Sequence, residues 1–332
     1  MKKNCLYLFL IVFTTFSCSK EATITPINPE PEQPIIPEVF NPIYNTSNSG
    51  LLSNIINDIK FDGTLAKIST NNGYTTFNGS NWNTLTTSNS MLPSNKINCT
   101  ITNGSTTWIA TDGGLVAYSG STMTIYNTGN SPIPANKIRS LEIDNMGNVW
   151  IGTFSGGGLA KFDGINWNIY TPSNSGLPNN SLSAIKSDNL GNIWLATASG
   201  ISKFDGINFT NYNVSNSPLL NNSVFSIAID NNIVWIGSNG GLSRFDGINW
   251  QNYTMQNSGL PLNLIRSIVL ESANNLWIGM AGQGIANFNS TNNSWTHFNA
   301  NNTNLQNNFV NAITIAPDNK KWLSTENGIA IK

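Results

Sequence analysis

Few side chains in this sequence could carry out nucleophilic, acid–base or metal chemistry. His297 is the only histidine, so neither a His-based metal site nor a histidine relay can be assembled. Cys5 and Cys18 lie near the N-terminus and leave Cys99 as a single thiol, which we interpret as a small buried residue rather than a nucleophile. The residues therefore predict no catalytic site, no metal site and no cofactor.

Residues that break a regular repeat are better candidates for a functional site, because the repeated residues build the scaffold. In each of seven repeats, one such residue follows the apolar residue that begins the innermost strand. A second set lies in the loops between the second and third strands, which we expect on the same face of the fold. We predict a ligand-binding face from the two sets, which are Asn57, Asn98, Arg139, Ser183, Phe225, Arg266 and Asn311, and then Asp112, Phe154, Met280 and Glu326. Convergent arginines, amides and an aromatic ring could hold a polar ligand such as an oligosaccharide or a peptide. The alternative is a solvated rim that binds nothing.

The elements that would position these residues come from a sequence repeat of about 41 to 45 residues. The phrase Asn-Ser-Gly-Leu-Pro recurs with variations, and its first residue is Asn48, Asn89, Asn130, Asn174, Asn216, Asn257 and Asn302. A tryptophan recurs at Trp108, Trp150, Trp194, Trp235, Trp277 and Trp322, with Lys67 in its place in the first copy. Seven such copies built from short strands are typical of a β-propeller. We expect the tryptophans to pack between blades.

One copy predicts four antiparallel strands, the content of a propeller blade. Residues 136–143 and 148–153 are apolar and β-branched stretches separated by a turn-forming cluster. Residues 159–162 and 166–171 flank an Asp-Gly pair, which is a strong hairpin signal. No helix is expected between residues 44 and 332. The first-turn aspartates, Asp144, Asp188, Asp230 and Asp318, leave calcium binding open, although they lack the dense pattern of a calcium loop.

The two ends of the repeat array predict a closed ring. The seventh copy stops after its third strand, and residues 40–50 parallel residues 167–176, which form a fourth strand and its following loop. The N-terminal strand can therefore complete the last blade and leave no open edge between first and last blades. The expected fold is all-β, a seven-bladed β-propeller over residues 39–332 whose last blade is closed by the N-terminal strand.

The repeats resemble those of the two-component regulator propeller family, as in the segment IDNMGNVWIGTFSGGGLAKFDGINWNIYT. The resemblance covers about residues 40 to 332. It implies an extracytoplasmic sensor-type propeller of the kind found in large hybrid signalling proteins. Those proteins continue into an immunoglobulin-like module, a membrane helix and a kinase, so for this chain we expect a binding module that does not signal alone.

The N-terminus predicts an export signal and a lipid anchor. Lys2 and Lys3 precede an apolar run over residues 5–16, too short to cross a bilayer. Residues 15–18 resemble a bacterial lipobox, which implies cleavage after residue 17 and lipidation of Cys18; an ordinary cleaved signal peptide is the alternative. Residues 18–38 would form a proline-rich tether. The expected location is the cell envelope, on the outer membrane.

The composition limits the kinds of partner that we expect this protein to bind. Only 10% of residues are charged and the formal net charge is -1, so no basic surface for nucleic acid is expected. The first functional hypothesis is a monomeric, non-catalytic envelope protein that binds an unknown oligosaccharide, peptide or envelope protein on one propeller face and contacts the membrane only through its anchor. The second is an accessory sensor that passes ligand occupancy to a separate protein. The third is a propeller enzyme such as a lyase, with Asp58 or Glu326 as its acidic group.

Overall fold

The computed structural model describes residues 38–154 and 156–332. The predicted signal peptide (1–17), Cys18 and nearly all of the predicted tether (18–38) lie outside these residues. Every regular element in the described part of the chain is a strand, as expected from the sequence. No helix there is long and apolar enough to cross a membrane.

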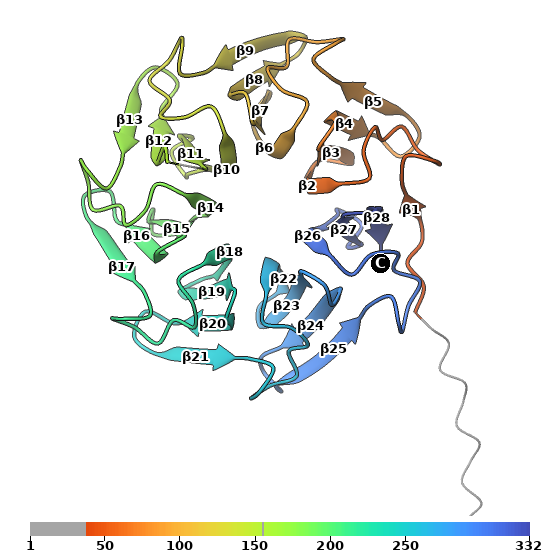
Figure 1. Cartoon of the computed structure of the whole chain (residues 1–332), viewed down its shortest axis with the longest axis vertical. Helices are drawn as coiled ribbons and strands as arrows, with labels where there is room; N and C mark the ends of the chain where they lie inside the picture. The colour runs from red at the N-terminus through yellow and green to blue at the C-terminus, as the bar shows by residue number, and fades with distance from the viewer. Residues whose placement is uncertain (1–37, 155) are drawn as a thin grey trace, which may run out of the picture. The chain divides into compact units, whose positions relative to one another are not determined.

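Seven four-stranded antiparallel sheets form a ring around a central axis (Figure 1). The inner strands are β2 (Ile56–Asp62), β6 (Ile97–Asn103), β10 (Ile138–Ile143), β14 (Leu182–Ser187), β18 (Val224–Asp230), β22 (Ile265–Ser272) and β26 (Val310–Ile315). The second strands are β3 (Leu65–Thr70), β7 (Thr106–Thr111), β11 (Val149–Thr153), β15 (Ile193–Thr197), β19 (Ile233–Ser238), β23 (Asn275–Met280) and β27 (Lys321–Thr325).

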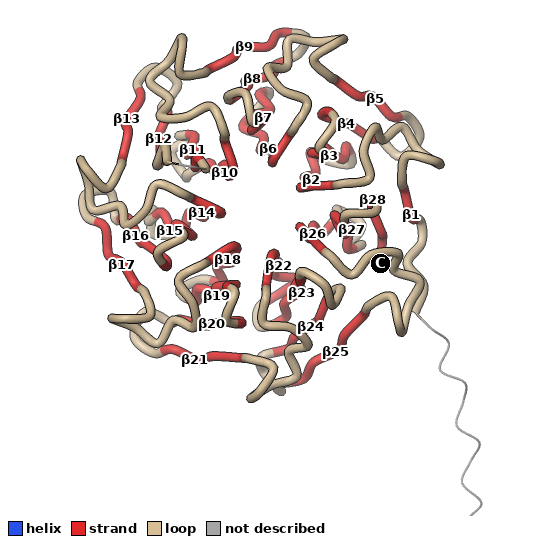
Figure 2. The backbone as a smooth tube through the Cα atoms, viewed as in Figure 1, coloured by secondary structure: helices blue, strands red, loops and turns tan. Residues whose placement is uncertain are grey.

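The third strands are β4 (Gly73–Phe77), β8 (Leu115–Ser119), β12 (Leu159–Phe162), β16 (Gly200–Phe204), β20 (Gly241–Phe245), β24 (Ile285–Asn289) and β28 (Gly328–Ile331). The outer strands are β5 (Trp82–Leu85), β9 (Thr122–Tyr126), β13 (Trp167–Tyr170), β17 (Phe209–Tyr212), β21 (Trp250–Tyr253), β25 (Ser294–Phe298) and β1 (Ile43–Tyr44). We number the blades 1 to 7 in the order of these inner strands. Figure 2 shows that loops at the ends of the strands make up the rest of the ring.

The N-terminal strand closes the ring as predicted. β1 pairs antiparallel with β28, with Ile43 opposite Ala330 and Tyr44 opposite Ile329. Phe40 precedes this strand and is buried among blades 6 and 7, in a cluster with Trp277 and Leu305. Its main-chain N–H donates to Asn304 Oδ1 at 2.6 Å, and Asn304 Nδ2 donates back to its carbonyl at 3.0 Å. The last blade therefore contains strands from both ends of the chain.

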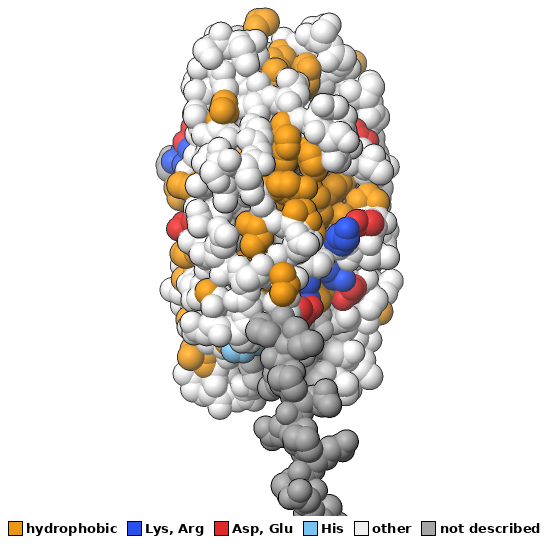
Figure 3. All heavy atoms as spheres, turned by 90° about the vertical axis from the view of Figure 1, so that its right-hand side faces the viewer, with side chains coloured by type: hydrophobic (Ala, Val, Ile, Leu, Met, Phe, Trp, Pro, Cys, Tyr) orange, Lys and Arg blue, Asp and Glu red, His pale blue; other side chains and the backbone are white. Residues whose placement is uncertain are grey.

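The hydrophobic core lies between blades rather than at the axis. Seven buried clusters each join the facing sides of two neighbouring blades. The recurring tryptophans belong to these clusters, as expected; Trp150, for example, meets Phe204 of the next blade edge-on at 6.0 Å between ring centroids. Side chains of the inner strands surround the central axis. Seen edge-on, the side of the ring that faces the viewer in Figure 3 carries only a few charged side chains, as the composition predicts.

Blade 1 replaces the tryptophan with a buried lysine. Lys67 is only 4% exposed, and its ammonium group donates to Asp62 Oδ2 at 2.7 Å. It also donates to the hydroxyls of Thr102 and Thr107 in blade 2, at 2.7 and 2.8 Å. Because a buried charge is tolerated only when paired and hydrogen-bonded, these three acceptors explain how lysine replaces an aromatic ring at this junction.

The first asparagine of the repeat phrase has a structural role that explains why it recurs. It accepts a hydrogen bond from a main-chain N–H three residues earlier and donates to a carbonyl five residues earlier, as Asn174 does with Thr171 and Ile169. The same pair of bonds forms in all seven copies. The amide thus fixes the loop that leads from each outer strand to the next inner strand.

Candidate functional site

A β-bulge at the start of every inner strand presents one side chain to the axis. In each blade the pairing of the inner with the second strand shifts between the first and third residues, as between Ile138 and Ser140 in blade 3. The same shift occurs in the other six blades. A bulge re-aims the extra residue, and that residue is the varying position singled out in the sequence. We call this residue of each blade the bulge residue.

The bulge residues surround a central cavity of about 400 Å³. Most residues of the predicted ligand-binding face line it, namely Asn57, Asn98, Arg139, Ser183, Phe225, Arg266, Asn311 and Glu326. Asp112 and Phe154 do not line this cavity, and Met280, expected on the same face, is instead fully buried in the core between blades 5 and 6. The expectation for Met280 was therefore wrong, because its side chain fills the junction between two blades.

Three neighbouring bulge residues join adjacent blades. The side-chain amide of Asn57 donates to the carbonyl of Ile97 at 2.6 Å. Asn98 donates in the same way to Ile138 at 2.7 Å, and Asn311 to Ile56 at 3.0 Å. Blades 7, 1, 2 and 3 are thereby linked around one half of the cavity mouth.

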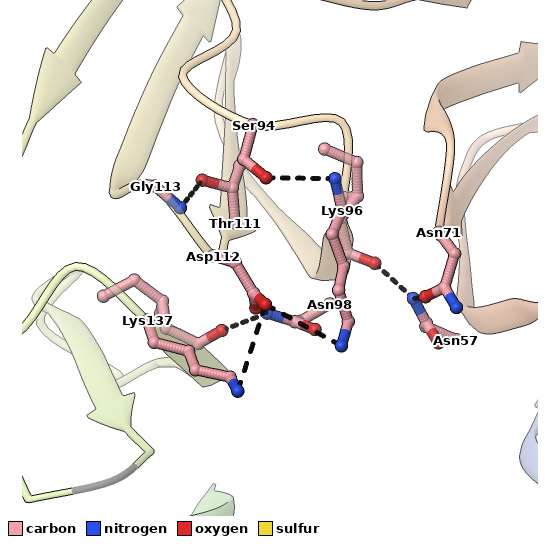
Figure 4. A network of polar contacts seen from close by, with 11 residues as sticks. Asn57, Asn71, Ser94, Lys96, Asn98, Thr111, Asp112, Gly113 and Lys137 are labelled. Carbon is pink, nitrogen blue, oxygen red and sulfur yellow. Dashed lines mark hydrogen bonds and ion pairs between the residues drawn. The ribbon is translucent and has the colours of Figure 1, made fainter.

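Asp112 lies beside this half of the mouth in a polar network (Figure 4). Its carboxylate accepts a hydrogen bond from Asn98 Nδ2 at 2.8 Å and lies 3.7 Å from Lys96 Nζ and 4.0 Å from Lys137 Nζ. Lys137 also lies over the ring of Phe154, with Nζ 5.1 Å from the ring centroid. Asp112 and Phe154 therefore flank the site and organise two lysines beside it.

The other half of the mouth carries the two arginines. Arg266 lies between two aromatic rings, with its guanidinium carbon 5.4 Å from the centroid of Phe225 and 5.3 Å from that of Phe309. Burial lowers the pKa of the Arg266 guanidinium, and the positive charge of Arg139 lowers it further, whereas Glu326 opposes the change. Arg139 is exposed. The two arginines therefore act on one another across the same cavity.

Deeper in the cavity lie charged residues that the predicted ligand-binding face does not include. Asp58 lines the cavity at a position where other copies have a small residue, and its carboxylate lies 3.3 Å from Lys60 Nζ. Lys186 also lines it and pairs with Glu142 of the preceding blade at 3.1 Å. The sequence marks Asp58 as a departure from the repeat, but it does not show which charges of adjacent blades face one another.

Of the two reactive side chains, Cys99 lines the central cavity and is partly exposed there, so the expectation of a buried residue was wrong in this respect. Burial, together with the negative charge of Asp58, raises the pKa of the Cys99 thiol to about 12. A thiol with so high a pKa carries almost no thiolate at neutral pH. His297 lies on β25, the outer strand of blade 6, and contacts Asn299 at 3.3 Å between ring and amide nitrogens.

The first-turn aspartates bind donors of their own blade. Asp144 accepts hydrogen bonds from the main-chain N–H of Asn148, from the Asn148 side-chain amide and from Trp150 Nε1 at 2.8 to 3.0 Å. Asp188 repeats the arrangement with Asn192 and Trp194. In residues 38–154 and 156–332, no group of three or more His, Cys, Asp or Glu is arranged to hold a metal ion.

We therefore expect calcium and a chelator to leave the thermal midpoint of the protein unchanged. The carboxylates of Asp144 and Asp188 already accept bonds from N–H donors, which a cation would have to displace. Differential scanning fluorimetry in calcium and in EDTA checks this. A difference between the two conditions above about 2 °C would contradict it, since that corresponds to about 0.5 to 1 kcal/mol for a domain of this size.

Together, the fold and the cavity define a seven-bladed β-propeller with a charged axial site. Residues 132–155, which are part of one copy of the repeat, match the family model described as two component regulator propeller. The family resemblance inferred from the sequence is therefore confirmed. No curated protein matches the sequence.

Solved structures share the fold at low identity. The extracellular domain of a putative hybrid two component system from B. thetaiotaomicron is 20% identical, with a TM-score of 0.72, and the match covers 88% of this chain and 39% of that one. PorZ, a surface component of the type-IX secretion system of Porphyromonas gingivalis, is 13% identical (TM-score 0.70, 87% and 48% covered). Virginiamycin B lyase from Staphylococcus aureus is 14% identical (TM-score 0.68, 84% and 94% covered). The chain thus spans about two fifths of that extracellular domain, and the same fold occurs in a lyase.

Proposed function

We propose that this chain is a non-catalytic binding module of the cell envelope that takes a polar ligand or protein partner in its axial cavity. The observation that carries the proposal is the pair of arginines, Arg139 and Arg266, which line the cavity and, in the described part of the chain, have no carboxylate partner within 4.0 Å. A cavity of about 400 Å³ falls within the usual range for ligand sites. The lipobox-like sequence before Cys18 supports a lipid anchor, and the proposed location is the outer membrane, to which this anchor would attach the protein.

A thermal-shift screen of the purified protein against oligosaccharides and peptides tests this proposal. A ligand that binds only the folded state at a hundredfold excess over its dissociation constant stabilises that state by about 2.7 kcal/mol. We expect a hit whose shift is lost in Arg139→Ala and in Arg266→Ala. Arg244→Ala is the matched control, because Arg244 belongs to the third strand β20, where it lies over the ring of Trp235, and does not line the cavity. A shift that persists in both cavity variants would place the binding site elsewhere.

An accessory sensor is the second candidate, and the match to the two component regulator propeller supports it. In this case the propeller passes ligand occupancy to a separate membrane protein. Cross-linking in intact cells followed by purification would then recover a transmembrane signalling protein. Recovery of abundant envelope proteins alone would count against a sensory role.

The non-catalytic part of the proposal has a direct test, because the fold is shared with virginiamycin B lyase. The high pKa of the Cys99 thiol and the outer position of His297 support the absence of catalysis. Asp58 and Glu326 remain as acidic groups in the cavity. Incubation with quinupristin, the compound bound to an inactive variant of that lyase, should return the compound unchanged by mass spectrometry. Conversion that is lost in Asp58→Asn or Glu326→Gln would overturn the proposal.

A further inference from the structure

We propose that the ligand is anionic and that its carboxylate, sulfate or phosphate group binds between Arg139 and Arg266. This inference rests on the proposed binding function, which it makes more specific. It follows from how charge is distributed and paired around the cavity.

The cavity is electropositive although the chain as a whole is not. Its lining contains the cationic side chains of Lys60, Lys96, Arg139, Lys186 and Arg266, against the carboxylates of Asp58 and Glu326. The formal net charge of the whole chain is -1. Because Lys60, Lys96 and Lys186 are paired with carboxylates, the positive charge without a partner is that of the two arginines, and low-dielectric walls strengthen its field.

The lysines of the cavity have carboxylate partners, whereas the arginines do not. Lys60, Lys96 and Lys186 each lie within 3.1 to 3.7 Å of a carboxylate oxygen. In the described part of the chain, neither Arg139 nor Arg266 forms an ion pair within 4.0 Å. The fold provides carboxylate acceptors for the lysines, and an external anion would provide acceptors for the two arginines.

The aromatic rings leave Arg266 prepared for such a contact. Phe225 and Phe309 hold its guanidinium group between them at 5.3 to 5.4 Å. A guanidinium group packed against aromatic rings keeps its N–H donors, and a planar anion can accept two parallel bonds from them. Arg139 faces the same cavity and lowers the pKa of Arg266, so bringing an anion between them relieves repulsion between two like charges.

The opposite half of the mouth is built differently. There the bulge residues Asn57, Asn98 and Asn311 donate to main-chain carbonyls of the neighbouring blade. Asp112 lies beside them and is paired with Lys96 and Lys137. Because the donors of this half are already used within the fold, we expect the anionic group of the ligand on the side of Arg139 and Arg266, on blades 3 and 6.

A first experiment needs no knowledge of the natural ligand. The thermal midpoint of the full chain is measured in sulfate and in citrate against chloride at matched ionic strength, for the wild type, Arg139→Gln, Arg266→Gln and the control Arg244→Gln. General salt stabilisation acts on every variant alike. We expect the wild type and the control to show an additional shift that both cavity variants lack. We also expect Arg139→Gln, without added anion, to melt about 1 to 3 °C above the wild type at low salt, because one of two like charges is removed.

A second experiment identifies the source of the anionic group. Binding is compared within matched pairs, oligogalacturonate against neutral galacto-oligosaccharide, and glutamate-rich against glutamine-rich peptide. Arg266→Gln should weaken binding of the anionic member at least tenfold and leave the neutral member unaffected. If only the anionic saccharide loses affinity in this variant, the ligand is an acidic saccharide; if only the anionic peptide does, the ligand is an acidic peptide.

The outcomes separate this inference from the proposed function. Equal binding of the neutral member would overturn the anion site while leaving a binding module. Anion-dependent shifts that are the same in wild type and cavity variants would also overturn the anion site. If no anion and no member of either pair shifts the wild type, the anion site is wrong, and protein partners recovered by cross-linking become the test of the binding function.

Discussion

Replacing Phe40 by alanine is expected to lower the free energy of unfolding by about 3 to 5 kcal/mol. The side chain is 1% exposed and lies between blades 6 and 7, immediately before the strand that closes the ring. Truncation leaves a cavity among Trp277, Ile285 and Leu305 and loosens the attachment of β1. Urea denaturation followed by tryptophan fluorescence measures the loss.

The neighbouring residue provides the control. Val39 is 60% exposed, so Val39→Ala should change the free energy of unfolding by no more than about 0.5 kcal/mol. If Phe40→Ala proved as mild as Val39→Ala, the closing segment would contribute little and the ring would be held by its other six junctions.

The second large effect is expected for Asp144→Ala, which should lower the free energy of unfolding by about 2 to 4 kcal/mol. Its carboxylate accepts several bonds, and a hydrogen bond to a charged group contributes about 1.5 to 3 kcal/mol. Removing it leaves the indole N–H of Trp150 and the amide of Asn148 buried without their acceptor. Thermal and urea unfolding of the variant measure the loss.

Blade 5 supplies the matched control for this prediction. Asp230 occupies the equivalent turn, but its only side-chain bond is to Asn231, and Trp235 Nε1 does not reach it. Asp230→Ala should therefore cost less than about 1 kcal/mol. Equal losses in Asp144→Ala and Asp230→Ala would show that the turn, and not the bond to the tryptophan, carries the stability.

The same turns predict acid sensitivity. Burial alone would raise the pKa of Asp144, but bonds from Asn148 and Trp150 outweigh it and lower the pKa below its usual value; Asp188 behaves in the same way. A lowered folded-state pKa stabilises the fold above the unfolded value near 3.9 and loses that contribution as pH falls below it. Part of the stability of the wild type should therefore disappear below about pH 4, and Asp144→Asn should flatten this dependence.

The fold could be predicted from the sequence because local and global signals agree. In the one copy whose strands were predicted, the expected bounds agree with β10 to β13 to within two residues, and the parallel between residues 40–50 and 167–176 predicted which strand closes the ring. The bulge was not predicted, although its residue was, since the varying position shows in the repeat alignment while the shifted pairing does not.

The site was predicted only in part, because its decisive contacts cross from one blade to the next. Nothing near Asn57 in the sequence shows that its amide reaches the carbonyl of Ile97. The pairing of Lys186 with Glu142 likewise joins residues 44 positions apart. Such partners are set by the angle between neighbouring sheets, which repeat spacing does not determine.

Closure by β1 has a consequence for the order of folding. The pairing of Ile43 with Ala330 joins nearly the first and last described residues, so the strand made first must wait for the strand made last. Contacts of such long sequence separation form slowly, because the entropy of closing the loop is lost before the contact forms. Asn311 and Glu326 belong to this last blade. The central cavity therefore becomes complete only after the residues of blade 7 have been made, and a shorter chain can hold folded blades while the cavity lacks part of its lining.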